Sequence, residues 1–454
     1  MSTQPTAREQ WNSRLGFMLA ALGSAVGLGN IWRFSYVAGE SGGAAFLLIY
    51  LLCIAAIGIP ILMAEFTIGR RAQQDVVGSF QSIAPGKPWV IGGFLGVASA
   101  FIILSFYGVV AGWSLYYFTQ YLTGGPQPPA GGDYGDFFGQ FHTATWFPLL
   151  WQFLFMFMVV AIVFVGVKKG IEKSNKILMP LLAILVLILA GYGMTLGGAG
   201  EALSFLFAPD WSALADPGIY LAALSQAFFS LSLGMGALIT YGSYLSKKEK
   251  LPGAAVGVAS MDSLFAIVAG LMIFPAVFTF GIAPDSGPGL VFVTLPQVFS
   301  DLNMGLIYGL LFFFLLTAAA VSSGVSLLEV AVAYFMRQMN WTRQKASVII
   351  GTIIFFIGIP SSLGFGAWSG VTLIGGRDIQ DSMDFLASYI FLPIGGLIIA
   401  LFIGWGWKKS DALEASNFGD SLIGNIWIWI LRIFAPAAII LVFLGSTGLL
   451  DLLF

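Results

Sequence analysis

The sequence has one cysteine, Cys53, and one histidine, His142, among its 454 residues. A single cysteine excludes an intrachain disulfide and a cysteine-rich metal site, and a single histidine excludes a multi-histidine metal or haem site. The chain also lacks a phosphate-binding loop of the G-x-x-x-x-G-K-S/T type, so ATP is not expected to be its energy source. Lysine plus arginine (20) nearly balance aspartate plus glutamate (22), so no basic face is expected to bind nucleic acid.

Charged residues are scarce as well. They make up 9% of the chain, where a soluble domain carries about 25%. Hydrophobic residues make up 58%, and glycine contributes 57 residues. Frequent glycine suits close helix packing and broken helices in a bilayer. This composition predicts an all-α polytopic membrane protein with one transport domain over residues 1–454.

A membrane-spanning helix needs about 20 mostly apolar residues. The sequence contains eleven such stretches. They cover residues 12–37, 43–70, 89–122, 147–167, 172–196, 218–244, 254–282, 305–337, 344–361, 384–407 and 423–450.

Basic residues cluster at every second connection between the predicted spans. The clusters are Arg8 with Arg14; Arg70, Arg71 and Lys87; Lys168, Lys169, Lys173 and Lys176; Lys247, Lys248 and Lys250; Arg337, Arg343 and Lys345; and Lys408 with Lys409. Loops rich in lysine and arginine remain in the cytoplasm. The N-terminus is therefore predicted to be cytoplasmic, and an odd number of spans places the C-terminus outside. Short tails favour the inner (plasma) membrane of a bacterium.

Two spans contain residues that are poor material for a continuous helix. Residues 23–30 of the first span read GSAVGLGN, and residues 230–236 of the sixth read SLSLGMG. Interruptions at matching positions of two half-chains indicate a transporter built from inverted repeats. We expect one repeat at about 12–196, a second at about 218–407, and an accessory span at about 423–450.

Interrupted helices expose backbone groups that a cargo can satisfy. Freed carbonyl oxygens coordinate a cation, and the N-terminus of a half-helix favours an anionic group. A zwitterionic amino acid together with a sodium ion fits both requirements. The alternative is that these glycines only permit tight helix packing.

The sequence resembles the neurotransmitter:sodium symporter family in motifs that follow one another in family order. These are Trp11 and Arg14, SAVGLGNIWRF (24–34), GESGGAAF (39–46), AEFTIGR (64–70), SQAFFSLSLGMG (225–236), TAAAVSSGVSLLE (317–329) and MDF (383–385). The resemblance covers nearly the whole chain, and is greatest to bacterial eleven-span members that carry hydrophobic amino acids. It implies a LeuT-like 5+5 inverted repeat plus one accessory helix, with helices 1 and 6 broken at mid-membrane.

The resemblance also implies two sodium sites. The first would use the Ala25 carbonyl, Asn30, Ser230 and Asp262 together with the substrate carboxylate. The second would use the carbonyls of Gly23, Val26 and Ala319 and the hydroxyls of Ser322 and Ser323. These hard oxygen ligands suit a hard cation. The alternative for the serines is hydrogen bonding within their own helix.

By the same comparison, thirteen residues surround the substrate: Ser24, Ala25, Gly27, Leu28, Gly29, Ile103, Tyr107, Phe229, Ser230, Ser232, Met235, Ser323 and Leu327. Tyr107 would hydrogen-bond the carboxylate, and Phe229 would close over the site. Monoamine carriers of the family have aspartate at the position of Gly27, so glycine favours an amino acid here. The uncharged, adaptable side-chain pocket predicts hydrophobic L-amino acids, aliphatic and aromatic.

The resemblance places gates at both ends of the pathway. Arg33 and Asp384 resemble the outer charge pair, and charges at this depth normally pair across an aqueous cavity. Arg8, Trp11, Ser243 and Tyr244 resemble the cytoplasmic gate. The family often has aspartate at the position aligned with Arg337, so the partner of Arg8 stays open.

Three further residues of the chain bear on the transport cycle or on its framework. A glycine and a proline in span 5, Gly170 and Pro180, resemble a family spacing thought to let the cytoplasmic end unwind; a static kink is the alternative. Glu65 is interpreted as a buried structural acid of span 2, with the alternative that it is a local partner of the basic cytoplasmic loop.

Chloride is not expected to be needed. Chloride-dependent relatives use a serine one helical turn beyond an asparagine of span 7. Here the asparagine position is Asp262 and the serine position is Ala266. Alanine removes a chloride ligand, and aspartate supplies a fixed negative charge that should stay ionised beside a cation.

Other functions remain as alternatives. A sodium-coupled carrier of another small zwitterion or of an amine would share most of these features. A cation channel would need a continuous pore lined by rings of carbonyls or charges. An enzyme would need a nucleophile and base or a metal set within the spans, and His142 is predicted to lie exposed in a polar loop. The sequence leaves the oligomeric state open.

Overall fold

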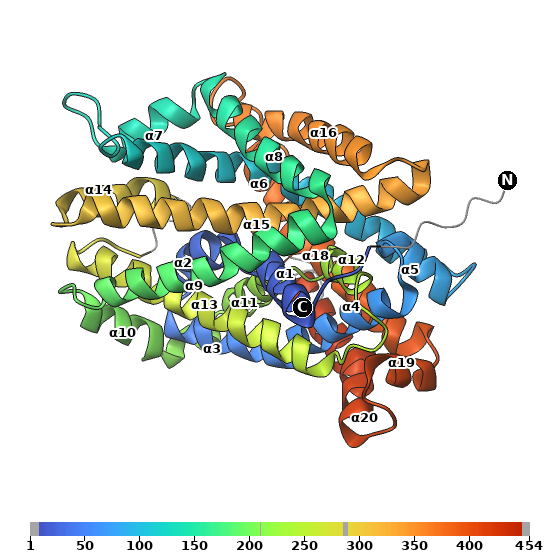
Figure 1. The fold of residues 1–454 in the computed structure, drawn as a ribbon. Helices are drawn as coiled ribbons and strands as arrows, with labels where there is room; N and C mark the ends of the chain where they lie inside the picture. Colours follow the sequence, from blue (N-terminus) through green and yellow to red (C-terminus); the bar gives the residue numbers. More distant parts are fainter. Residues whose placement is uncertain (1–8, 209, 285–288, 447–454) are drawn as a thin grey trace.

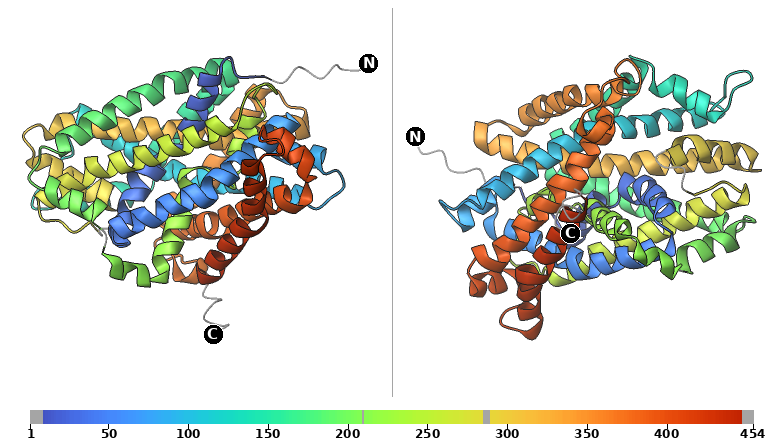
Figure 2. Two further views of the ribbon diagram at one scale, coloured as in Figure 1. Left: turned by 90° about the horizontal axis from the view of Figure 1, so that it is seen from below. Right: turned by 180° about the vertical axis from the view of Figure 1, so that it is seen from behind.

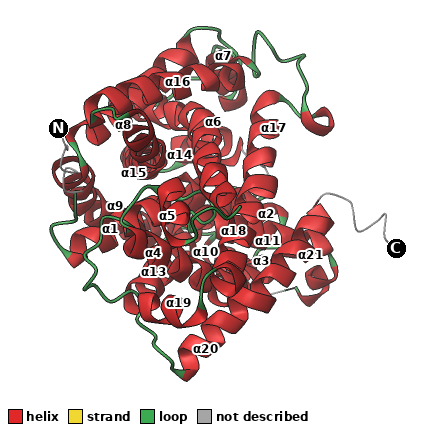
Figure 3. Ribbon diagram, turned by 90° about the vertical axis from the view of Figure 1, so that its right-hand side faces the viewer, coloured by secondary structure: helices red, strands yellow, loops and turns green. Residues whose placement is uncertain are grey.

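The computed structural model describes residues 9–208, 210–284 and 289–446. The described chain consists of helices joined by loops (Figure 3). Most helices lie roughly parallel in one bundle, and α15 (Gly305–Met339) runs through its length (Figure 1). The C-terminal helices, red in Figure 2, run along the outside of the bundle.

Within the described residues the helices form eleven spans, several of which contain a short π-helical turn; the label η marks either such a turn or a short 3-10 helix. In chain order they are α1 (Arg14–Ala25), η1 (Gly29–Arg33) and α2 (Phe34–Glu40); α3 (Ala44–Cys53), η2 (Ile54–Gly58) and α4 (Ile59–Ala72); α6 (Val90–Leu122); α8 (Phe147–Val165); η3 (Val167–Glu172) and α9 (Lys173–Gly193); α11 (Pro217–Ser230) and α12 (Ala237–Gly242); α13 (Pro252–Thr279); α15; α16 (Arg343–Leu363); α17 (Ile379–Phe385), η7 (Leu386–Phe391), α18 (Leu392–Leu401) and η8 (Phe402–Gly406); and α20 (Leu422–Trp429), η9 (Ile430–Phe434) and α21 (Ala435–Ser446).

Nine of these spans, within the described residues, are long and apolar enough to cross a bilayer as single helices. The first span is a tenth, because its halves form a bent pair with an angle of 48°. The sixth consists of two shorter helices, α11 and α12.

Both predicted breaks are present, and local residue types explain them. In the first span the helix stops at Ala25, Val26 is extended with a ψ of 108°, and the helix resumes at Gly29. In the sixth span, Gly234 and Gly236 have φ values of 79° and 75°. Such angles are favourable for glycine and disfavour a continued right-handed helix.

Shorter helices connect the spans and lie at the two ends of the bundle. They are α5 (Val76–Ile83), α7 (Tyr134–His142), α10 (Ala199–Phe207), η4 (Trp211–Ala215), η5 (Leu290–Thr294), α14 (Leu295–Asp301), η6 (Ile374–Gly376) and α19 (Lys409–Ser416). In Figure 1, α7, α10 and α14 lie at the left end and α5 at the right.

The broken helices are enclosed by the other spans. Helix α1 packs against α9, α13 and α15, while α11 packs on α3 and α12 packs on α4. The contact between α4 and α12 depends on Gly69, because a Cβ there would collide with the Ile239 carbonyl oxygen. This packing places both breaks in the centre of the bundle.

The predicted eleven-span architecture is confirmed, with differences at a few ends. Span 10 begins at Ile379 rather than 384, because the Asp378 carboxylate caps the helix by accepting from the Asp381 amide. The lysine-rich segment Val167–Glu172 forms a π-helical turn, so span 5 begins at Val167 rather than 172. The described part of the last span ends at Ser446, so its predicted end at 450 lies outside the described residues.

Candidate functional site

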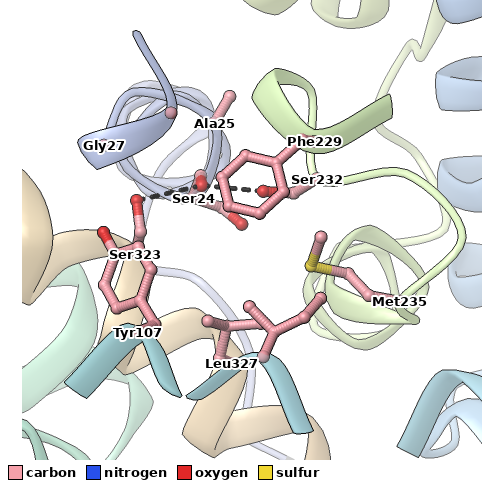
Figure 4. A pocket seen from close by; sticks show the side chains of 11 residues that line it. Ser24, Ala25, Gly27, Tyr107, Phe229, Ser232, Met235, Ser323 and Leu327 are labelled. Carbon is pink, nitrogen blue, oxygen red and sulfur yellow. Dashed lines mark hydrogen bonds between the residues drawn. The ribbon is translucent and has the colours of Figure 1, made fainter. Parts of the chain in front are cut away.

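A small cavity lies between the two helix breaks. Its lining consists of Ser24, Ala25, Gly27, Gly29, Ile103, Tyr107, Phe229, Ser232, Met235, Ser323 and Leu327 (Figure 4). These are eleven of the thirteen residues that the sequence comparison placed around the substrate. The cavity volume is about 20 Å³, so a bulky ligand could enter only if these side chains moved apart.

One end of the cavity is polar. The Tyr107 and Ser323 hydroxyls lie side by side against the break of the first span (Figure 4). A Cβ at Gly27 would collide with Ser323 Oγ and would lie 3.1 Å from the Tyr107 oxygen. The absence of a side chain at Gly27 therefore keeps this polar end open to a carboxylate.

The other end of the cavity is apolar. Met235 and Leu327 lie across from the hydroxyl groups (Figure 4), and Ile103 completes this wall. Phe229 covers the cavity and is only 9% exposed. An apolar side chain attached to a polar head group would match both ends.

The two breaks contact each other through hydroxyl groups. Ser232 Oγ donates to the Ser24 carbonyl at 2.8 Å, and the Ser24 hydroxyl bonds to Ser326 at 2.8 Å. Leu28 and Ser230, the remaining predicted pocket residues, do not line the cavity. The Leu28 amide faces the Tyr107 hydroxyl at 3.4 Å, and Ser230 turns towards Asp262.

The predicted ligands of the first sodium site converge around Asp262, which is fully buried in α13. Its carboxylate accepts from Asn30 Nδ2 at 2.7 Å and from Ser230 Oγ at 2.6 Å. Ala25 lines the adjacent cavity. Sequence reasoning missed Tyr50, whose hydroxyl donates to Ser230 at 3.2 Å. A buried carboxylate, an amide and hydroxyls in contact fit the ligand preferences of a sodium ion.

The predicted ligands of the second sodium site also converge. Ser323 Oγ lies 3.3 Å from the carbonyl oxygens of Gly23 and of Val26. Ser322 Oγ donates to the Ala319 carbonyl at 2.9 Å and lies 3.5 Å from that of Val26. Hydroxyl hydrogen bonds are usually about 2.7–2.8 Å long. The longer separations around Ser323 leave several oxygens facing one another, which suits a small cation.

The predicted outer charge pair lies against Phe229, which covers the cavity. Arg33 is 2% exposed, and its guanidinium lies 3.9 Å from the Asp384 carboxylate and 4.9 Å from the centre of the Phe229 ring. Two missed residues also hold it: Gln226 accepts from Arg33 at 3.0 Å and Ser225 at 3.2 Å. Arg33 therefore links the outer gate to the aromatic cover of the pocket.

The described residues of the predicted cytoplasmic gate lie around Trp11. Its indole Nε1 donates to the Tyr241 carbonyl at 3.0 Å, and its amide donates to the Tyr244 carbonyl at 3.1 Å. Ser243 donates to the Thr240 carbonyl within its own segment. Arg8 lies outside the described residues.

Two acids that the sequence did not single out form ion pairs with arginines near this gate. Glu329 accepts from the Tyr244 hydroxyl and from Arg343, the latter at 2.6 Å. Arg337 forms an ion pair with Asp75, so this arginine has a partner on the opposite loop. Such pairings between single polar residues are not visible in the sequence pattern.

The end of span 5 that is predicted to be cytoplasmic is hydrogen-bonded to the N-terminal segment. Glu9 accepts from the Val167 amide at 2.7 Å, and Glu172 accepts from the Asn12 amide at 2.7 Å. The span is helical from Val167 to Gly193, with Gly170 and Pro180 inside it. Its unwinding stays a prediction.

Two residues outside the pocket also have defined surroundings. Glu65 is buried and accepts from the Gly234 amide at 2.8 Å, as expected of a structural acid. His142 is half-buried rather than exposed: its ring stacks on Phe138 at 4.2 Å and its Nδ1 contacts the Phe138 carbonyl at 2.7 Å. Burial among aromatic rings lowers the pKa of His142 below 6.5.

Comparisons with known proteins agree with this geometry. The model of the sodium:neurotransmitter symporter family matches residues 8–126 and 145–447. An uncharacterized sodium-dependent transporter of Bacillus subtilis, YhdH, is 40% identical over 97% of this chain and 98% of its own length. A Haemophilus influenzae sodium-dependent transporter is 35% identical over 98% and 100%.

A solved structure is closely similar as well. The crystal structure of MhsT in complex with L-phenylalanine matches with a TM-score of 0.93 and 64% identity, covering 97% of this chain and all of that one. The fold is therefore the LeuT fold. A transporter of this kind moves its cargo without chemical conversion, so the protein is not an enzyme. This chain belongs to the sodium:neurotransmitter symporter family, a family of sodium-dependent transporters.

Proposed function

We propose that the protein is a sodium-coupled symporter that takes up hydrophobic L-amino acids, aliphatic and aromatic, by alternating access. The observation that carries this proposal is the cavity between the two helix breaks, with hydroxyls at one end and only apolar side chains at the other. L-Phenylalanine in the structure of MhsT supports the same substrate class.

The substrate carboxylate is proposed to lie beside Tyr107 and the first sodium ion. Gly27 leaves the space for it, whereas any larger residue would meet Ser323. The side chain points towards Ile103, Met235 and Leu327, which carry no charge. Methionine adapts to several shapes, so a range of apolar side chains is expected to fit.

Two sodium ions are proposed to accompany each amino acid. The first is held by Asn30, Ser230, Asp262 and the Ala25 carbonyl. The second is held by the carbonyls of Gly23, Val26 and Ala319 and by the hydroxyls of Ser322 and Ser323. Each charge that moves inward gains about 2.3 kcal/mol per 100 mV. Two charges with a neutral zwitterion gain about 4.6 kcal/mol, which supports roughly thousandfold accumulation. Chloride is not required, because Asp262 supplies the negative charge near the first site.

Alternating access needs one gate to open while the other stays closed. Opening towards the outside would separate Arg33 from Asp384 and lift Phe229. Opening towards the cytoplasm would release Trp11 from Tyr241 and Tyr244. The proposed setting is the bacterial inner membrane with a cytoplasmic N-terminus, an external C-terminus, and repeats at about 12–196 and 218–407.

The test is binding of a radiolabelled amino-acid panel to purified protein in sodium, potassium and choline buffers. Leucine, phenylalanine, tyrosine and tryptophan are expected to compete for one site, and only in sodium. Undiminished binding in choline would contradict sodium coupling. Selective binding of an amine or of a small polar zwitterion would show that the substrate class is wrong.

A further inference from the structure

The side chain of Asn175 in α9 has a buried oxygen with no hydrogen-bond donor in the described part of the chain. Its side chain is 1% exposed, and Nδ2 donates to the Ile171 carbonyl at 2.9 Å within the same helix. Its Oδ1 has no hydrogen-bond partner among the described residues. Leaving a buried acceptor unpaired costs about 1–3 kcal/mol, so an oxygen kept in this state needs a reason.

That oxygen faces the backbone of the proposed second sodium site. Asn175 Oδ1 lies against Gly23, where an added Cβ would collide with it. The carbonyl oxygen of the same glycine lies 3.3 Å from Ser323 Oγ. A single glycine residue therefore separates the unpaired amide oxygen from the ligands around Ser323.

Asn175 also lies on the side of that site that faces the cytoplasm in the proposed orientation. Its neighbour Lys173 is exposed, and the Lys176 side chain is 38% exposed. An ion leaving the second site in this direction must exchange carbonyl and hydroxyl oxygens for water. An intermediate oxygen ligand would lower the barrier to that exchange, since sodium prefers oxygen ligands.

We propose that Asn175 is a further sodium-binding residue: its amide oxygen takes up the second sodium ion as that ion leaves for the cytoplasm. The inference rests on the proposed function and adds a residue to its exit path. It also explains why position 23 lacks a side chain, because any Cβ would displace this oxygen. The competing explanation is that Asn175 only packs α9 against α1 through a weak Cα–H contact.

Three substitutions separate the two explanations. Asn175→Leu keeps the approximate size and removes the oxygen. Asn175→Ala removes the side chain but leaves room in which water can supply an oxygen. Asn175→Asp keeps the oxygen and adds charge. Asn303→Leu, at an exposed position in the outer loop before α15, is the matched control.

The experiment loads purified protein with radioactive sodium and L-phenylalanine, dilutes it into choline buffer, and follows the release of bound sodium. Asn175→Leu should release sodium about fivefold more slowly, while Asn175→Ala and the control stay within about twofold of the wild type. Asn175→Asp should lower the half-saturating sodium concentration by about threefold or more.

Two results would overturn the assignment. Equal slowing in the Ala and Leu variants would show a packing role, and wild-type release in Asn175→Leu would show no role at all. If the Leu variant fails to fold, an unchanged half-saturating sodium concentration in Asn175→Asp contradicts the proposal. Failure of the proposed function looks different, because the wild type itself would then retain no sodium with any amino acid.

Discussion

Gly27 is the residue at which a single added side chain should prevent the cargo from binding. Gly27→Asp would place a carboxylate against Ser323 and Tyr107, where the substrate carboxylate is proposed to bind. Like charges in a dry site repel strongly. We expect amino-acid binding to weaken by more than about 100-fold, measured with radiolabelled leucine and phenylalanine.

The matched control for that substitution is Gly139→Asp in α7, where an added Cβ meets no atom within 4 Å. The control should bind like the wild type. Wild-type affinity in Gly27→Asp would show that the substrate carboxylate lies elsewhere.

Asp262 should set both sodium affinity and independence from chloride. Asp262→Asn removes the charge that Asn30 and Ser230 surround, so the half-saturating sodium concentration should rise about tenfold or more. Adding Ala266→Ser should recover part of the loss only when chloride is present. Asp301→Asn, at the exposed end of α14, is the control.

The wild type tests the same idea without substitution. Uptake into proteoliposomes should be unchanged when gluconate replaces chloride on both sides. A loss of about tenfold or more would refute the fixed-charge explanation, since a chloride-dependent carrier would then have lost its counter-anion.

His142 should make the stability of the fold sensitive to mild acid. Burial lowers its folded-state pKa below 6.5, so the unfolded chain binds a proton more readily than the fold does. The stabilisation is therefore complete above about pH 6.5 and is lost as the pH falls below it. The temperature of the thermal unfolding midpoint should fall when the pH is lowered from about 7.5 to about 5.5. His142→Phe should reduce that fall. An identical pH dependence in both proteins would contradict this reading.

At the scale of elements, weakening one contact should increase hydrogen exchange in both the N-terminal segment and span 5. Glu172 accepts from the Asn12 amide at 2.7 Å and from Lys176 at 2.6 Å. Glu172→Gln removes the charge that strengthens these bonds, worth about 1–3 kcal/mol. Hydrogen exchange of residues 11–16 and 167–175 should then quicken by about tenfold. Glu201→Gln on the exposed face of α10 should leave that exchange unchanged.

The helix breaks could be predicted from sequence, whereas the contacts around them could not. Glycine and serine clusters weaken a helix locally, so GSAVGLGN and SLSLGMG are visible without a structure. The pairing of Glu172 with Asn12, or of Glu329 with Arg343, joins residues whose spacing carries no periodic signal. Only the packed bundle brings such single polar residues together. The same limit explains why Tyr50 was missed beside a predicted ligand.

At the scale of the whole molecule, the orientation can be tested with cysteines, because Cys53 is the only native one. In a Cys53→Ala background, Thr195→Cys and Lys248→Cys occupy exposed positions at opposite ends of the bundle. A membrane-impermeant maleimide should label the first in intact cells and the second only in inverted vesicles. The reverse pattern would contradict the positive-inside assignment.

The hydroxyl of Ser323 faces the carbonyl oxygens of Gly23, Ser24 and Val26 but has one proton to donate. The Ser24 carbonyl already accepts from Ser232 at 2.8 Å, so the Ser323 proton is shared between the carbonyls of Gly23 and Val26, the second of which also lies 3.5 Å from the Ser322 hydroxyl. A sodium ion at the proposed second site would bind these oxygens together, so cargo binding should also stabilise the fold. By thermodynamic linkage, each tenfold rise in sodium above its dissociation constant should add about 1.4 kcal/mol to the free energy of unfolding. Protein prepared in potassium should therefore be less stable to unfolding as well as inactive in transport.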